Sequence, residues 1–379
     1  MFAQAQLPQG YYATLPVTPS PNGNISALTT ATPLPLWTYS VTGYDSRSYS
    51  GTAIGRSPYS KGKTTTNIPL QIIPLIITIN NGAGNSVTYD PTVPDSCVTG
   101  GLTDVAVITG SPIFTNNTWM MNGVNVGNTQ YIDAFQRAQF WSLVADSPYH
   151  LIFNESTLPG QALSFGSSGT NGPGTNYPAG TFGGQSCPVG VVNINNLDAA
   201  VQTLISSLSP TVNVGTFPMF LTKNVFMAET GDSIFSNCCI LGYHSGVNVG
   251  SNLLVYSPFS IDTTGIFGGG YVSTISHEIA EAVNDPTGNN PTPPWGAEGQ
   301  VTAGNCQSNF EVGDPLSPGF PTPTNSFSVN GGNGLTYKLQ ELAFFNWFFG
   351  GTSLGAGGKY SNNGTFSGFA KACPPGGTN

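Results

Sequence analysis

The apolar positions of this chain fall mainly in short runs of the kind that β-strands require. Residues 36–44 (LWTYSVTGY) alternate apolar with polar side chains, and residues 217–227 and 252–261 are rich in aromatic and aliphatic side chains. The longest apolar run, residues 68–79 (IPLQIIPLIITI), is interrupted by Pro74. Since a membrane-spanning helix needs about 20 apolar residues, we predict that this run forms a pair of core strands.

Four segments instead show the helical period, with apolar residues three and four positions apart. They are residues 129–145, 195–209, about 271–284, and 337–350. The third follows three consecutive glycines and ends at Asp285, which precedes a proline, where helices ordinarily stop.

Strand runs and helices follow one another irregularly, which predicts an α+β fold, with mixed α/β as the alternative. Residues 104–114 (DVAVITGSPIF) read as one of the strands, and residues 160–190 as a long loop rich in Gly, Ser, Asn and Pro. Residues 1–35 have weak periodicity and many prolines, so we expect an extended N-terminal arm. Residues 36–379 are then a single large β-rich domain with about four helices.

Charged side chains are scarce in this chain. Only 7% of its 379 residues are charged, against about 25% in an average soluble protein. The apolar fraction of 39% is nevertheless that of a folded protein rather than a disordered one. Its 18 acidic and 9 basic residues give a net charge of −9. Nucleic acids and anionic membranes are therefore not expected as partners, because phosphate groups are bound by clustered Lys and Arg.

The cysteines predict disulfides and export. They are even in number and form no CxxC pair, which argues against a four-cysteine zinc site and allows up to three disulfides of open connectivity. We expect Cys238 and Cys239 to bond to two different partners, since a bridge between neighbours strains the backbone. Together with an Ala-Gln-Ala sequence at positions 3–5, like the end of a secretory signal, this predicts a secreted, extracellular protein. The six are Cys97, Cys187, Cys238, Cys239, Cys306 and Cys373.

The stretch STISHEIAEAVNDP, residues 273–286, carries the most specific chemical pattern. His277 and Glu281 are four positions apart and share one helix face, so they can bind one cation. Glu281 stands where HExxH zinc peptidases have a second histidine, and carboxylate oxygen is an accepted zinc ligand. In those enzymes the glutamate at the position of Glu278 takes a proton from the attacking water. The pattern therefore predicts a zinc site with Glu278 as the catalytic base.

A third protein ligand is expected among the acidic residues downstream of this helix. Glu311 and Asp314, in the segment NFEVGDP, are both candidates, and the sequence does not choose between them. No Lys or Arg occurs between positions 224 and 337 to neutralise these carboxylates, which repel one another unless a cation is bound. A site with this many carboxylates can also bind Ca²⁺ or Mn²⁺.

The two remaining histidines carry weaker signals. His150, in SPYHLIF, is interpreted as a packed histidine. His244, in LGYHSG, is a candidate catalytic group that stabilises an oxyanion, with structural packing as the competing role. The motif also has an interpretation without metal, because a solvated amphipathic surface helix accounts for Glu278 and Glu281 on its own.

A family resemblance joins these segments. SHEIAEAVNDP, then Trp295, then FEVGDP resembles the EXORDIUM or phosphate-induced protein family and related bacterial secreted proteins, which carry a similar HE-L-A-E helix and an E-I-x-D segment. CCILGYHS, residues 238–245, is similar to a cysteine–glycine–aromatic–histidine stretch of that family. The resemblance covers residues 100–350 in the order of its blocks. It departs at Pro315, near where the family tends to place a cysteine whose disulfide role Cys306 would take over. It implies an extracellular, cell-wall-linked protein with a shared site and names no reaction.

These observations favour a secreted metal-dependent hydrolase, most directly a zinc peptidase acting on a peptide or cell-wall polymer. One alternative is a non-enzymatic extracellular or cell-wall-associated protein with a structural metal, whose Asn, Ser, Thr and aromatic residues suit carbohydrate binding. Another is a metal-free acid hydrolase in which Glu278 and Glu281 form a pair and like charge raises one pKa. A serine hydrolase is not expected, because no GxSxG motif occurs.

Overall fold

The structure is a computed structural model. It describes residues 11–19, 28–29, 31–60, 64–82, 86–94, 97, 101–167, 169–181, 185, 187–229, 238–267, 272–296, 306–317, 325–370 and 373. Within these residues, no helix combines the length and apolar character that crossing a membrane requires.

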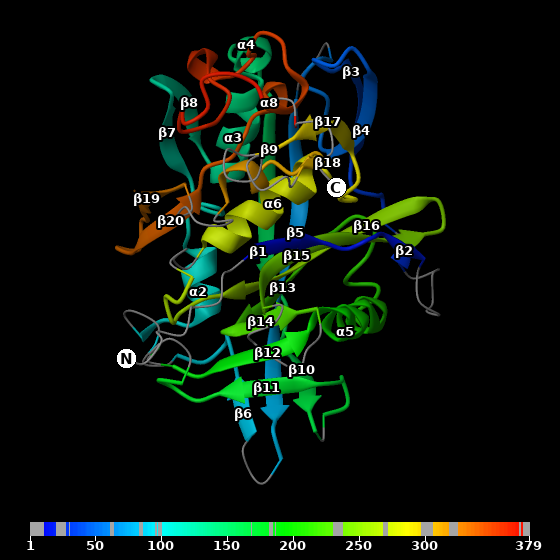
Figure 1. The fold of residues 1–379 in the computed structure, drawn as a ribbon, viewed down its shortest axis with the longest axis vertical. Coiled ribbons are helices and arrows are strands. Elements are labelled where there is room, and N and C mark those ends of the chain that lie inside the picture. Colours follow the sequence, from blue (N-terminus) through cyan, green and yellow to red (C-terminus); the bar gives the residue numbers. More distant parts are fainter. Residues whose placement is uncertain are drawn as a thin grey trace.

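A sheet of twelve strands, counted over the described residues, organises the chain (Figure 1). Its longest strand is β5 (Thr65–Asn80), and β15 (Cys238–Val249) and β16 (Asn252–Ile261) form its longest antiparallel pair. The main path is β10-β5-β13-β16-β15-β14-β12-β11, while β6 and β9 pair with β5, and β1 and β2 pair with β15. The other strands are β1 (Tyr11–Thr14), β2 (Thr18–Pro19), β6 (Ser86–Tyr89), β9 (His150–Thr157), β10 (Gln161–Gly166), β11 (Gly174–Tyr177), β12 (Val189–Asn193), β13 (Phe217–Lys223) and β14 (Val225–Ala228).

Smaller hairpins and most of the helices pack together in one core on one side of this sheet. The hairpins are β3 (Leu36–Thr42) with β4 (Ser48–Ile54), β7 (Asn117–Met121) with β8 (Val124–Thr129), β17 (Pro291–Trp295) with β18 (Gln307–Asn309), and β19 (Ser326–Asn330) with β20 (Thr336–Gln340). The helices are α2 (Asp104–Thr109), α3 (Tyr131–Gln139), α4 (Trp141–Val144), α5 (Ile194–Ser207), α6 (Ser273–Asn284) and α8 (Phe345–Phe349), with 3-10 turns η2 (Asp314–Leu316) and η3 (Ala356–Gly358). The expected β-rich α+β class is confirmed.

Both faces of the sheet are covered, which explains why its strands read as continuous apolar runs. Alternate residues of β5 enter two different cores: Ile68, Leu70 and Ile72 pack with α3 and α6, whereas Ile73, Leu75, Ile77 and Ile79 pack with α5. The prediction of two strands over residues 68–79 was wrong, because one strand passes through Pro74, which lies opposite Leu221 of β13.

Two predictions about local structure were also wrong. Residues 337–350 do not form one helix: β20 occupies their first part and only α8 is helical. Tyr337 and Leu339 are buried on either side of an exposed Lys338, which is the period of a strand. Residues 104–109 form α2 rather than a strand, because the Thr103 hydroxyl accepts a hydrogen bond from the Ala106 amide (3.1 Å) and caps the helix.

Regions that the sequence assigns to irregular structure contribute to the sheet. The expected loop at residues 160–190 contains β10 and β11, where β10 pairs with β5 and β11 with β12. The expected N-terminal arm is extended over residues 11–19, and its strands β1 and β2 lie along β15. Strand pairing with partners distant in sequence leaves no local signal in either case.

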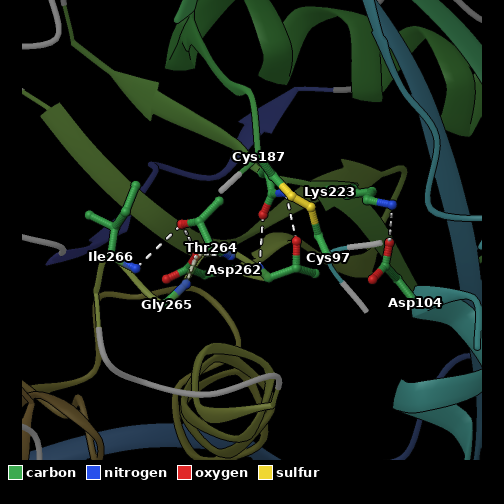
Figure 2. Close-up of a disulfide and its surroundings, with 10 residues drawn as sticks. Cys97, Asp104, Cys187, Lys223, Asp262, Thr264, Gly265 and Ile266 are labelled. Atoms are coloured by element: carbon green, nitrogen blue, oxygen red, sulfur yellow. Dashed lines mark hydrogen bonds and ion pairs between the residues drawn. A yellow bond between two sulfur atoms is a disulfide. The ribbon is translucent and has the colours of Figure 1, made fainter. Parts of the chain in front are cut away.

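Three disulfides connect the cysteines: Cys97–Cys187, Cys238–Cys239 and Cys306–Cys373. Figure 2 shows the first of them, close to the buried ion pair between Lys223 and Asp104 (3.4 Å). The expectation that Cys238 and Cys239 bond elsewhere was wrong, because the other four cysteines pair among themselves. The peptide bond that joins the two neighbours is cis and brings their Cα atoms to 3.0 Å. Disulfides of this number indicate an oxidising environment.

Candidate metal centre

Helix α6 carries the HExxE motif and lies entirely inside the protein. It begins at Ser273 and ends at Asn284, close to the predicted bounds, and all twelve of its residues are buried. It packs against β15 and β16 of the sheet and against β20. The interpretation of the motif as a solvated surface helix is therefore wrong. Burial of two carboxylates on one helix is costly unless protons, hydrogen bonds or a cation compensate it.

Glycines in neighbouring segments allow α6 to approach closely. A Cβ atom at Gly242 of β15 would lie 2.6 Å from Oε1 of Glu278, and a Cβ at Gly313 would collide with the ring of His277. Only glycine at these two positions lets the strand and the downstream segment contact the motif.

The His277 ring is oriented by Gln340 of β20. The Gln340 side-chain amide donates to the carbonyl of Gly313 (2.6 Å), which turns its Oε1 toward Nδ1 of His277 (3.1 Å). Nδ1 therefore carries the proton, and the lone pair of Nε2 faces the acidic residues. Burial lowers the His277 pKa to about 4, although Asp314 and Gln340 oppose this shift. The ring is consequently neutral at pH 7, the form that binds metal.

The side chains of Glu281 and Asp314 approach Nε2 of His277. We call His277, Glu281 and Asp314 the outer triad. Nε2 lies 2.9 Å from Oε2 of Glu281 and 3.7 Å from Oδ1 of Asp314. The other Glu281 oxygen accepts a hydrogen bond from the Gly313 amide (3.1 Å), which fixes that carboxylate. Two acceptor atoms that face each other at 2.9 Å need a proton or a cation between them.

The outer triad opens into a small cavity of about 200 Å³. The Asp314 side chain is 20% exposed there, whereas the other two members of the triad are buried. A cation in the outer triad is therefore accessible to a small part of a substrate. The residues that line the cavity are Tyr12, Ala13, Glu281, Gln307, Asn309 and Asp314.

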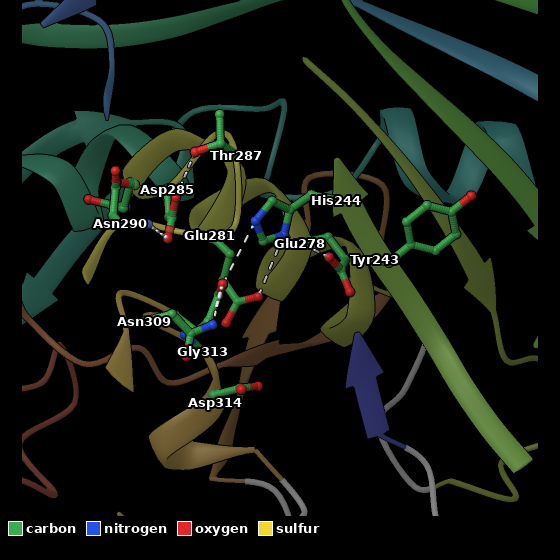
Figure 3. A network of polar contacts seen from close by, with 12 residues as sticks. Tyr243, His244, Glu278, Glu281, Asp285, Thr287, Asn290, Asn309, Gly313 and Asp314 are labelled. Carbon is green, nitrogen blue, oxygen red and sulfur yellow. Dashed lines mark hydrogen bonds and ion pairs between the residues drawn. The ribbon is translucent and has the colours of Figure 1, made fainter. Parts of the chain in front are cut away.

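A second group, which we call the inner triad, contains His244, Glu281 and Glu311 and is wholly buried. Nδ1 of His244 lies 3.8 Å from Oε2 of Glu281, and its Nε2 lies 3.8 Å from Oε2 of Glu311. Glu278 adjoins this group, with its Oε2 3.5 Å from Nδ1 of His244 (Figure 3). Glu281 thus lies between the two histidines and belongs to both triads.

The charges of this cluster are poorly compensated by protein groups. Burial lowers the pKa of His244 to about 3, and the charge of His277 adds to the effect. Burial also raises the pKa of Glu278 and Glu281 well above the ordinary range; neighbouring carboxylates raise that of Glu278 further, and Asp314 raises that of Glu281. Among the described residues, neither His244 ring nitrogen and neither Glu278 carboxylate oxygen has a hydrogen-bond partner. Neutral imidazoles and carboxylates without hydrogen-bond partners are suitable ligands for a divalent cation.

The structure brings together every residue that the sequence nominated for the site. His277, Glu281 and Asp314 form the outer triad, and Glu311 joins His244 in the inner one. Glu298, a further acidic residue between α6 and Glu311 in the sequence, lies outside the described residues. His150 lies apart from the cluster on β9, where its Nδ1 is 2.7 Å from Oδ2 of Asp133.

Two contacting residues were missed by the sequence analysis. Gln340 lies in a segment whose apolar spacing predicts a helix, and Tyr12 lies in the expected N-terminal arm. The Tyr12 ring stacks on the His277 ring with centroids 3.6 Å apart and planes inclined by 17°. An aromatic residue in a Pro-rich stretch gives no local sign of such a contact.

Comparison with protein-family models, with curated proteins and with solved structures finds no match for this chain.

Proposed function

We propose that this protein is an extracellular metal-dependent hydrolase that cleaves peptide bonds, with a cation held by the outer triad. The observation that carries the proposal is the convergence of His277, Glu281 and Asp314 beside a cavity that Glu281 and Asp314 line. One neutral imidazole and two carboxylates are a donor set that zinc accepts, and a hydrolytic site needs such access for water and substrate.

A divalent cation in this position supplies Lewis-acid polarisation of a carbonyl and makes a nearby water more acidic. Glu278 accepts the proton of the attacking water and returns it to the departing amine. Its burial beside other carboxylates raises its pKa, which suits a group that both takes and gives a proton. His244, whose Nδ1 lies 3.5 Å from Oε2 of Glu278, supplies a donor for developing negative charge.

Zinc is the cation that this proposal names, with Mn²⁺ as the alternative. Ca²⁺ fits less well, because it prefers six to eight oxygen ligands and the outer triad contributes an imidazole nitrogen. An imidazole together with carboxylates is common to zinc and manganese sites.

The test is elemental analysis of the purified protein, combined with one variant at the site and one away from it. The wild type is expected to hold an equimolar amount of zinc, and His277→Ala is expected to lose it. His150→Ala is the matched control, since it removes a histidine outside the cluster and should leave the zinc content unchanged. Full metal content in His277→Ala would overturn the assignment.

One observation favours a second function, a wall-associated or surface protein with a structural metal. The inner triad is buried throughout, as closed structural sites are. This alternative agrees with the resemblance to the cell-wall-linked EXORDIUM family. It predicts that the metal is tightly bound and stabilises the folded protein, and that the metal-bound protein does not cleave peptides.

A further inference from the structure

Strand β1 occupies the edge of β15 directly beside the candidate metal centre. Strand β15 pairs with β16 along its opposite edge, and near its own start β15 pairs with β14. From Gly242 onward, the edge next to β14 is paired with the N-terminal segment: Tyr12 lies opposite Gly242, Ala13 opposite Tyr243 and Thr14 opposite His244. These β15 residues are also the part of the strand that contacts Glu278 and supplies His244.

Further contacts keep the segment on this edge beyond β1. The Leu15 amide donates to the His244 carbonyl (3.4 Å), and the Ser245 hydroxyl donates to the Leu15 carbonyl (3.0 Å). Strand β2 continues the same parallel pairing, with Thr18 opposite Val247. Most of these are main-chain contacts, which a different extended polypeptide can reproduce because they do not depend on its side chains.

Tyr12 is the side chain that covers the site. It stacks on His277 and lines the cavity of the outer triad together with Ala13. Tyr11, Ala13 and Leu15 instead pack toward the core beneath α5, as alternation along a strand requires. The peptide link between Tyr12 and Ala13 therefore borders the cavity in which hydrolysis is proposed.

We propose that the β15 edge from Gly242 to Ser245 is a binding site for an extended polypeptide with an aromatic side chain over His277, and that β1 fills it in the resting protein. The inference rests on the proposed function, of which it names the substrate class. A tethered segment acts at an effective concentration of about millimolar, so it excludes competing peptides until it is displaced.

The test uses the full chain without metal, so that binding is measured apart from hydrolysis. The probe is a fluorescein-labelled peptide with the sequence of residues 9–19 (QGYYATLPVTP), followed by fluorescence anisotropy. Tyr12→Ala should bind this probe at least tenfold more tightly than the wild type, because its own β1 competes less well. Tyr12→Phe, which keeps the ring and removes the hydroxyl, is the matched control and should bind as weakly as the wild type. A probe in which the second tyrosine is alanine should bind Tyr12→Ala more weakly.

A double variant, Tyr12→Ala with Leu15→Ser, also removes the apolar side chain that directly follows β1 and guards against incomplete displacement. Equal, weak binding by the wild type, Tyr12→Ala and the double variant would overturn the proposal. Peptide cleavage by the zinc-loaded wild type without probe binding by any variant would leave the proposed function standing and this site refuted. Probe binding as expected, with no cleavage by any zinc-loaded protein, would uphold the peptide site and refute the hydrolase.

Discussion

Two buried acidic groups on opposite faces of the sheet differ in how well they are satisfied. On α5, Asp198 accepts hydrogen bonds from the hydroxyls of Tyr243 (3.0 Å) and Tyr256 (2.6 Å) and from the amide of Gln202 (2.7 Å). On α6, both carboxylate oxygens of Glu278 lack such partners among the described residues. Neighbouring residues of one strand supply the two environments, since Tyr243 and His244 point to opposite sides of β15 (Figure 3).

The difference separates a structural role from a functional one. Burial raises the pKa of Asp198, and its three hydrogen bonds oppose the rise. Burial also raises the pKa of Glu278, and there the neighbouring carboxylates raise it further. A buried polar group that is satisfied specifies packing, whereas one left without partners indicates a missing ligand or a reaction.

The largest effect is expected from Glu278→Gln. The variant keeps the shape of the side chain and removes the base, so hydrolysis of a peptide substrate should fall by about 10²–10⁴-fold. Zinc content and melting temperature should stay close to those of the wild type. Steady-state kinetics measure the rate of hydrolysis, elemental analysis measures the zinc content, and calorimetry measures the melting temperature. Undiminished activity would contradict the assigned role of Glu278.

Asp198→Ala tests the other side of the comparison. Loss of the acceptor leaves the buried Tyr243 and Tyr256 hydroxyls without their partner, which should reduce the free energy of unfolding by about 1–3 kcal/mol. Urea denaturation measures this change. Zinc content should be unaffected, and a loss of zinc in the folded variant would show that the two faces are not independent.

Gln340→Ala should have a smaller effect, confined to metal affinity. Without Gln340 the His277 ring loses the acceptor that fixes its orientation, and removal of such a partner weakens metal binding by about 10–100-fold. Competition with a fluorescent zinc chelator measures the affinity. Asn333→Ala, on the hairpin that contains β20 but outside the cluster, is the control and should bind zinc as the wild type does.

The smallest effect is a pH dependence of stabilisation by zinc. The raised pKa of Glu281 and Asp314 means that protons compete with the cation as the pH falls, so the zinc-induced rise in melting temperature should be larger at pH 8 than at pH 5. Without zinc, these carboxyls contribute stability below their usual pKa and lose it as the pH rises. The lowered pKa of His277 acts oppositely, contributing stability above pH 6.5 that is lost toward about pH 4. Melting curves at both pH values, with and without zinc, measure the difference.

The sequence predicted α6 and its motif well because their signals are local. The spacing of His277 and Glu281 and the proline after Asp285 lie within a few turns of one helix, and the acidic composition indicated the downstream partners. Tyr12 and Gln340 were not predicted, because each reaches His277 through strand pairing or packing between distant segments. The apolar spacing around Tyr337 fits a helix and a strand equally well, and pairing with β19 decides it.

The Cys306–Cys373 disulfide divides the candidate centre between two parts of the covalent chain. It closes a ring that contains Glu311, Asp314 and Gln340, whereas α6 and His244 lie outside that ring. The candidate centre therefore joins a helix to a covalently closed loop, and the disulfide restricts the conformations that this loop can take in the unfolded chain. Formation of the Cys306–Cys373 bond is in this way expected to favour the approach of Glu311 and Asp314 to α6.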